Sequence, residues 1–291
     1  MQREFLIAGP WAHFPWGDRV GDANLGEAAN LNTDSLLLHW FDHWMKDSGA
    51  FNGEPRIRYF ALGANEWRST DEWPARGGYA LYLHSQGNAN SREGDGVLGG
   101  EAPKNEEPRD VFVYNPEVPV AAPGGPQALN GPFDQAALEM GNNLLVYTSD
   151  PAVREAEILG HARVLLYAAT STAHADFTAK LVRVTPSGRA EFVSIGIARS
   201  SRLFRDQGYA ADTIHAWEFT LEPTSLVLAA GDRLRLEIAS SAFPLYDRNP
   251  STGVPPQDAD NWNWCRSTQQ VLHSAAHPSA LYLPVTGESP W

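Results

Sequence analysis

A single histidine near the start of the chain lies where a proton-transfer residue could work. His13 follows a short apolar run, residues 5–8, and the Gly9-Pro10 pair that ends this run in a turn. Imidazole titrates near neutral pH, so a histidine on the loop after a buried strand is a candidate general base. A histidine that only fills the turn is the other interpretation of the same position.

Two further histidines have the spacing of metal ligands. His39 and His43 enclose Asp42 in the run HWFDH, and histidines four residues apart share one face of a helix. The metalloprotease versions of this motif carry glutamate as the base and need a third ligand. We therefore predict that this run is structural and that the protein uses no metal and no cofactor.

Other motifs lack the context that their chemistry needs. The run GDGVLG, residues 94–99, matches a dinucleotide-binding pattern, but no buried strand precedes it and no helix follows. Asp258 and Asp260 have the spacing of calcium ligands without the glycine and the glutamate of an EF-hand loop. We expect no site at either position.

The sequence around His13 resembles a known family. The run GPWAH, residues 9–13, together with WFDHWMKD, residues 40–47, is similar to the segment that carries the catalytic histidine in CocE/NonD hydrolases, the cocaine-esterase and X-Pro dipeptidyl-peptidase-like family. The resemblance implies a serine hydrolase that acts on small-molecule esters or amides, with His13 as the triad histidine. It also implies an α/β-hydrolase domain followed by a jelly-roll, galactose-binding-like β domain.

The nucleophile and the acid of such a triad are missing from this chain. In α/β-hydrolases the order along the chain is serine, then aspartate, then histidine, with the serine in a G-x-S-x-G-like elbow. No such elbow occurs here, and the histidine is already at position 13. Asp176, beside His174, comes too late to be the acid, and we interpret it as a strand-end hydrogen-bonding residue. We therefore predict that the chain is the C-terminal part of a longer enzyme. We also predict that it is inactive without the N-terminal α/β-hydrolase portion.

Substrate contacts are predicted from neighbouring residues. Trp11 and Trp16 flank His13 and could form a wall beside the substrate, although indoles packed between domains are an alternative. Residues 114–133 are dense in proline and glycine yet apolar, which favours a loop packed across another surface. The family resemblance implies that this loop leads toward the active site. There the side chains of Gln127 and Leu129 would contact the acyl group of the substrate. The competing functional hypothesis is a non-catalytic jelly-roll module for binding or interaction.

Composition narrows the class of protein. The chain has 22 Lys and Arg against 35 Asp and Glu, a formal charge of −13, which disfavours nucleic-acid and anionic-membrane partners. One cysteine excludes an intrachain disulfide. No apolar run reaches the length of a membrane span and no leader pattern begins the chain, so we expect a cytoplasmic protein, with an upstream signal peptide left open. A homo-oligomer is compatible with this sequence.

The predicted elements are one helix and many strands. Apolar residues at helical spacing predict a helix over residues 33–46, with Thr33 as its cap and Gly49 as its stop: Leu36, Leu37, Trp40, Phe41 and Trp44. Strand patterns bounded by turn residues follow at 56–62, 79–84, 144–148, 156–170, 176–184, 191–199, 215–221, 233–240 and 280–285. Serial strands without helical periodicity predict a mainly β protein with a sandwich or barrel.

The predicted organisation has two parts. Residues 1–50 are expected to form the C-terminal edge of an α/β-hydrolase domain, namely its last strand, the His13 loop and the helix. Residues 51–291 are expected to form a jelly-roll β-sandwich, because HADFTAKL at 174–181 and DRNPSTG at 247–253 resemble the family's β domain. The strand at residues 5–8 has no parallel neighbour among the predicted strands, and the apolar face of the helix needs a cover.

Overall fold

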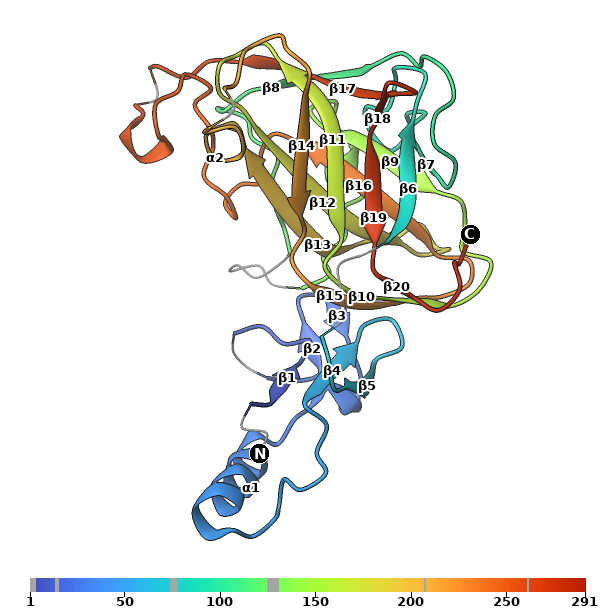
Figure 1. The fold of residues 1–291 in the computed structure, drawn as a ribbon, viewed down its shortest axis with the longest axis vertical. Coiled ribbons are helices and arrows are strands. Elements are labelled where there is room, and N and C mark those ends of the chain that lie inside the picture. Colours follow the sequence, from blue (N-terminus) through green and yellow to red (C-terminus); the bar gives the residue numbers. More distant parts are fainter. Residues whose placement is uncertain (1–3, 14–15, 74–77, 125–130, 207, 261) are drawn as a thin grey trace.

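The computed structural model describes residues 4–291 except 14–15, 74–77, 125–130, 207 and 261. Two lobes of unequal size are visible in Figure 1, a large β lobe above a small one that holds the N-terminal elements. Strands dominate the large lobe, which confirms the prediction of a mainly β protein. The predicted contacts Gln127 and Leu129 lie outside the described residues.

The small lobe contains a sheet that mixes early and later strands. Its elements are β1 (Leu6–Ala8), β2 (Arg19–Val20), β3 (Ala23–Asn24), η1 (Glu27–Ala29), α1 (Thr33–Lys46), β4 (Ile57–Ala61) and β5 (Glu66–Thr70). β1 pairs in parallel with β4, and β4 pairs antiparallel with β5. The expectation that the first strand has no parallel neighbour in this chain was therefore wrong. The predicted boundary between residues 50 and 51 falls inside this lobe.

Helix α1 occupies the predicted residues, but the residues that cap its two ends differ from those predicted. Its N-cap is Asn32, whose side chain accepts a hydrogen bond from the Ser35 amide, and not Thr33. At the other end the C-cap is Asp47, which has φ 50° in the left-handed region and lies two residues before the predicted stop, Gly49. None of the helix residues is buried.

The large lobe is built from strands β6 to β20. They are β6 (Tyr79–His84), β7 (Val97–Gly99), β8 (Asp110–Tyr114), β9 (Leu145–Ser149), β10 (Ala156–Gly160), β11 (Arg163–Thr170), β12 (Asp176–Val184), β13 (Ala190–Arg199), β14 (His215–Thr220), β15 (Thr224–Leu228), β16 (Arg233–Ala239), β17 (Ser267–Ser274), β18 (His277–Pro278), β19 (Ala280–Leu283) and β20 (Val285–Thr286). Short helices η2 (Leu138–Met140), α2 (Ser200–Leu203) and η3 (Pro256–Asp258) lie between them.

One long sheet encloses the main core. Its strands run in the order β13-β12-β16-β9-β7-β6-β19-β11-β17-β18, with β14 beside β11 and β8 beside β17. In Figure 1, β11, β14 and β19 lie in front of β12 and β16. Phe177 on β12 meets Trp217 on β14 with ring centroids 4.8 Å apart, so side chains from the two layers interlock in the core.

A second, smaller sheet of the large lobe meets the small lobe. Strands β15, β10 and β20 form this sheet, and Leu62 of the small lobe makes a parallel β-bridge with Leu226 of β15. Beside the bridge, Arg68 forms an ion pair of 3.1 Å with Glu157. The predicted strand at 156–170 is in fact two strands in different sheets, because the chain turns between Gly160 and Arg163 to pass from this sheet to the large one.

Candidate active site

The turn after β1 has a geometry that only glycine allows. A Cβ on Gly9 would lie 2.2 Å from the ring of Trp11, so the absence of a side chain lets that indole fold back over the turn. The indole Nε1 then donates to the carbonyl of Ala29 at 2.7 Å. The ring of Trp11 also lies 5.6 Å from that of Trp67 on β5. The small lobe therefore fixes the backbone that leads into His13.

His13 lines a cavity of about 430 Å³ between the two lobes. The walls are largely apolar, and they are contributed by the β1 turn, the β2–β3 hairpin and the sandwich: Pro10, Trp11, Ala12, His13, Val20, Leu25, Leu62, Gly131, Pro132, Phe192, Val193, Ser194, Ile195, Glu222 and Pro223. His13 itself is exposed. An apolar cavity with a few polar groups is the usual form of a site for small organic ligands.

Ser194 is a serine in the cavity wall, but its setting is not that of a nucleophile. Its hydroxyl donates to the backbone carbonyl of Glu222 at 2.6 Å. It lies within β13, whereas the nucleophile of an α/β-hydrolase follows a strand and opens a helix. The described part of the cavity thus contains a histidine and no activated hydroxyl beside it.

Two of the predicted contact residues lie near His13. Trp11 lines the cavity. Trp16 does not, and its indole Nε1 donates to the backbone carbonyl of His13 at 3.0 Å. The rings of Trp11 and Trp16 are 6.1 Å apart, so the two indoles pack near one another at the His13 turn.

The remaining motifs have structural surroundings. His43 accepts a long hydrogen bond, 3.4 Å, from the amide of Phe51, and its ring packs edge-on against Trp44. Among the described residues there is no cluster of three His, Cys, Asp or Glu side chains suited to a metal ion. Asp176 opens β12 and accepts a hydrogen bond from Asn249 at 2.8 Å, which confirms its interpretation as a strand-end residue.

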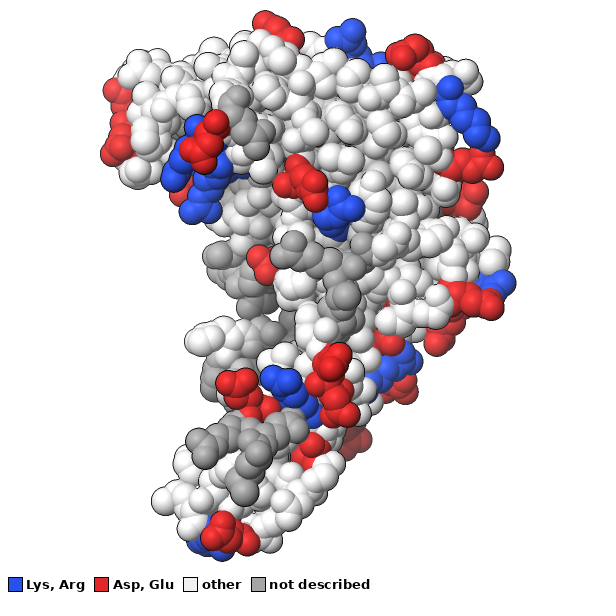
Figure 2. Space-filling view, viewed as in Figure 1, with Lys and Arg blue, Asp and Glu red and all other residues white. Residues whose placement is uncertain are grey.

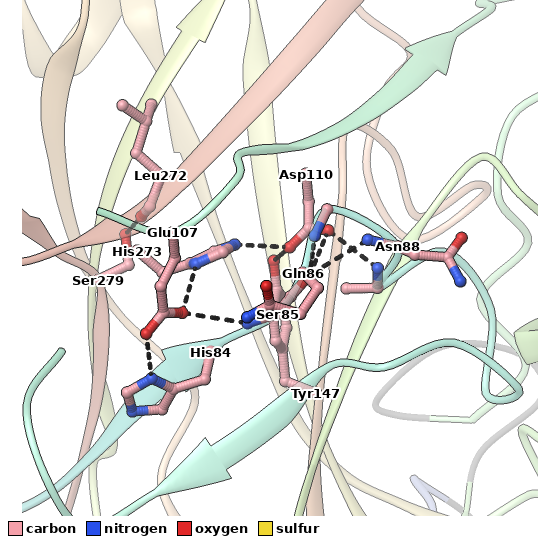
Figure 3. A network of polar contacts seen from close by, with 12 residues as sticks. His84, Ser85, Gln86, Asn88, Glu107, Asp110, Tyr147, Leu272, His273 and Ser279 are labelled. Atoms are coloured by element: carbon pink, nitrogen blue, oxygen red, sulfur yellow. Dashed lines mark hydrogen bonds and ion pairs between the residues drawn. The ribbon is translucent and has the colours of Figure 1, made fainter. Parts of the chain in front are cut away.

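A buried polar network lies elsewhere, inside the sandwich (Figure 3). His273 on β17 is fully buried, with Nε2 placed 2.8 Å from a carboxylate oxygen of Asp110 and Nδ1 placed 3.1 Å from one of Glu107. Glu107 also contacts His84 at 2.8 Å. Asp110 accepts further hydrogen bonds from the hydroxyls of Ser85 and Tyr147, both at 2.7 Å.

Burial and hydrogen bonding have opposite effects on the pKa values of His273 and Asp110. Burial lowers the pKa of His273, but hydrogen bonds and charge attraction from Asp110 and Glu107 outweigh it, so the net pKa is raised. Burial raises the pKa of Asp110, yet hydrogen bonds from His273 and its other donors leave it lowered. Both imidazole nitrogens face carboxylates, so both donate, and the ring is an imidazolium.

This network is not a hydrolytic triad, although it combines serine, histidine and aspartate. The hydroxyl of Ser85 donates to Asp110, and both nitrogens of His273 are taken by carboxylates. No histidine nitrogen is left to accept a proton from the serine. Sequence reasoning missed the network, because residues 86–110 show only low hydrophobicity. The residues of β17 are largely polar, so the sequence held no periodic signal that would have placed His273 inward.

Comparison with known proteins identifies the family. A family model described as the X-Pro dipeptidyl-peptidase C-terminal non-catalytic domain matches residues 49–282, and the chain belongs to this family. The cocaine esterase of Rhodococcus sp. (strain MB1 Bresler) is 31% identical over 293 residues, covering 96% of this chain and 51% of that protein. The chain is thus related to CocE/NonD hydrolases, as the sequence predicted.

Solved structures agree with this assignment. An α-amino acid ester hydrolase superimposes with a TM-score of 0.84 at 26% identity, covering 97% of this chain and 50% of that one. A CocE/NonD family hydrolase from Staphylococcus aureus shares the fold, with a TM-score of 0.58 at 14% identity over 88% of this chain and 46% of that one. The chain therefore spans about half the length of these relatives.

The surface and the helices add two observations. On the face seen in Figure 2, acidic and basic side chains are interspersed, with no broad region of one sign. Across the described ranges, every helix falls short of the length and apolar character that crossing a membrane requires.

Proposed function

We propose that this chain is the C-terminal part of a serine hydrolase that acts on esters or amides, and that it supplies the triad histidine, His13. One observation carries the proposal: the GPWAH turn places His13 on an apolar cavity at the junction of the two lobes. The relationship to an esterase at 31% identity supports it. The serine and the carboxylate would come from a preceding α/β-hydrolase portion.

The proposed parts follow from the same relationship. Residues 1–50 would be the C-terminal edge of that hydrolase domain, and residues 51–291 its jelly-roll β domain. The parallel pairing of β1 with β4 is typical of an α/β sheet, and because β4 follows residue 50 this pairing crosses the proposed boundary. Helix α1 also exposes an apolar face that a missing domain would cover, with Leu38 64% and Phe41 52% exposed.

The proposed role of His13 is proton transfer in two steps. An imidazole nitrogen accepts the proton of the serine hydroxyl while the serine oxygen bonds to the carbonyl carbon of the substrate. The imidazolium then donates this proton to the leaving alcohol or amine as its bond to that carbon breaks. Water repeats the sequence on the acyl-enzyme and releases the acid. The apolar walls around Trp11 and Phe192 would hold the organic part of the substrate.

A non-catalytic binding module is the second candidate. The matching family model, which covers residues 49–282, is described as non-catalytic. His13 lies outside those residues, so that description and the proposed role of His13 are compatible. The two candidates differ in whether His13 matters for turnover.

The test uses the chain joined in frame to the coding sequence upstream of Met1. We expect the joined protein to hydrolyse 4-nitrophenyl acetate and the isolated chain to match a heat-denatured control. His13→Ala should lower kcat/KM of the joined protein by several orders of magnitude with an unchanged circular-dichroism spectrum. His277→Ala, on β18, is the matched control and should retain activity. A joined protein that keeps most of its activity after His13→Ala would refute the assignment.

A further inference from the structure

A buried glutamine connects the two backbone segments next to the His13 cavity. Gln135 is fully buried, and its amide Nε2 donates to the carbonyls of Pro123 at 3.0 Å and Phe133 at 2.8 Å. Gly131 and Pro132, which directly precede Phe133, line the cavity. One side chain thus ties the cavity-lining segment 131–133 to residue 123.

A charged pair in the sandwich fixes the orientation of this amide. The Oε1 atom of Gln135 accepts a hydrogen bond from Lys180 Nζ at 2.9 Å, and Lys180 also pairs with Glu237 at 2.7 Å. Lys180 on β12 and Glu237 on β16 are direct partners across the sheet. Because the oxygen of the amide faces an ammonium, its NH₂ group must face the two carbonyls. Gln135 is therefore anchored to the paired strands β12 and β16.

The segment 131–133 also touches the small lobe. Gly131 has φ 118°, and a Cβ there would lie 2.9 Å from the carbonyl of Val20 on β2. The carbonyl of Pro132 accepts a hydrogen bond from Arg189 at 3.3 Å, and the same nitrogen of Arg189 bonds Asp22 in the β2–β3 turn at 2.7 Å. The segment is consequently held between the sandwich and the β2–β3 hairpin, of which Val20 and the adjoining residue Leu25 also line the cavity.

The opposite side of the segment supports a second wall residue. The carbonyl of Phe133 accepts a hydrogen bond from the amide of Phe192 at 3.1 Å, and Phe192 lines the cavity. Gln135 and Phe192 therefore share one acceptor. Moving Phe133 would shift both the segment 131–132 and the backbone of Phe192.

We infer that Gln135 is a positioning residue for the sandwich wall of the His13 cavity, which sets how the organic part of a substrate lies relative to His13. The placement of the wall is a property of this chain alone. Its effect on turnover rests on the proposed function. A purely local role in the stability of the sandwich is the competing explanation.

The first experiment measures amide hydrogen exchange in the isolated chain. Gln135→Glu keeps the shape of the side chain but cannot donate to Pro123 or Phe133. Because two hydrogen bonds are lost, we expect exchange at Phe192 and across residues 18–25 to become at least roughly tenfold faster. Gln269→Glu is the matched control, since Gln269 on β17 is also fully buried and its amide donates to Ser267 at 2.8 Å.

Two outcomes of the exchange experiment would contradict the claim that Gln135 positions the cavity wall. Equal acceleration in both variants, or none at Phe192 and residues 18–25 in Gln135→Glu, would overturn the inference. If Gln135→Glu does not fold, Gln135→Asn replaces it, because its shorter neutral amide can reach fewer of the three partners. It should accelerate exchange at the same sites to a smaller degree.

The second experiment measures esterase kinetics in the joined protein. A misplaced wall should raise KM for an ester with a bulky acyl group, such as 4-nitrophenyl benzoate, about tenfold while changing kcat less. The acetate ester should be little affected. A role in stability alone would lower the activity toward both esters by the same factor, which would overturn the inference. If the wild-type joined protein hydrolyses neither ester, the proposed function fails, while the exchange result still decides the role of Gln135.

Discussion

A charged histidine in the core makes the stability of the sandwich depend on pH. The folded-state pKa of His273 is raised above its ordinary value of 6.5. Its stabilising contribution is therefore complete below pH 6.5 and is lost as the pH rises through the folded-state pKa. Glu107 and Asp110 have lowered pKa values, so their contribution is present above their ordinary pKa values and is lost as the pH falls. The stabilising effect of the network should therefore be largest between the ordinary pKa of Glu107, 4.5, and that of His273, 6.5, and decline on both sides of this range.

Replacement of His273 should remove the loss of stability that accompanies a rise in pH. His273→Gln leaves a buried carboxylate without its charged partner and should lower the free energy of unfolding by about 3 kcal/mol near pH 6. The difference from wild type should shrink as the pH rises through the raised folded-state pKa of His273, where the native imidazole loses its proton. Urea unfolding at a series of pH values measures both effects. His277→Gln serves as the control, and a loss that stays equal across the whole pH series would contradict an imidazolium.

Two other buried acids also titrate unusually. Burial raises the pKa of Asp176 to about 6 despite the opposing effects of Arg199 and Asn249. The folded state therefore binds this proton more tightly than the unfolded state, and stability falls as the pH rises from about 4 to about 6. Asp176→Asn should make that slope shallower in thermal unfolding curves, and a slope unchanged from wild type would contradict the raised pKa of Asp176. The slope that remains in the variant belongs to Glu139, whose pKa burial and the nearby Glu237 raise to about 7.

At the scale of elements, the turn after β1 depends on one glycine. Gly9→Ala would place a Cβ against the indole of Trp11, which must then leave the Ala29 carbonyl. We expect a red shift of tryptophan fluorescence as an indole becomes exposed, with little loss in the melting temperature of the sandwich. Gly78→Ala is a suitable control, because a Cβ there meets nothing within 4 Å and its φ lies outside the left-handed region.

The elements differ in how well the sequence predicted them. Helix α1 and strands β6 and β12 have the predicted bounds, because long periodic patterns are strong local signals. Strand β17 was not predicted, since its residues 267–274 are largely polar and its burial comes from partners far away in the chain. The parallel pairing of β1 with β4 depends on contacts between residues about fifty positions apart, which periodicity does not encode.

The residues of the candidate site were likewise predicted only in part. A short motif was enough to single out His13 and Trp11, which line the described cavity. The opposite wall could not be inferred, because Phe192 and Ile195 belong to a strand whose sequence gives no sign that it faces His13. Gln135 was missed for a similar reason, as its partners Pro123, Phe133 and Lys180 are brought together only by the tertiary fold.

For the molecule as a whole, the apolar face of α1 is the most conspicuous open surface. Leu38 and Phe41 are exposed in the isolated chain. The double variant Leu38→Glu/Phe41→Glu should reduce the binding of a hydrophobic dye such as ANS, with an unchanged melting temperature. Val153→Glu, at a position 71% exposed on the large lobe, controls for added charge. Equal dye binding by wild type and the double variant would argue against a face that another domain covers.

The pairing of β1 with β4 has a consequence for recombining these proteins. A gene-level crossover at residue 50 would separate β1 from β4 and β5, which complete its sheet. A chimera built in that way would join β1 of one parent to foreign partner strands, whereas Leu62 and Leu226, which both follow residue 50, would keep their bridge. Libraries that exchange the large lobe between relatives should therefore place the crossover after Thr70, so that each inherited His13 turn keeps its own supporting strands.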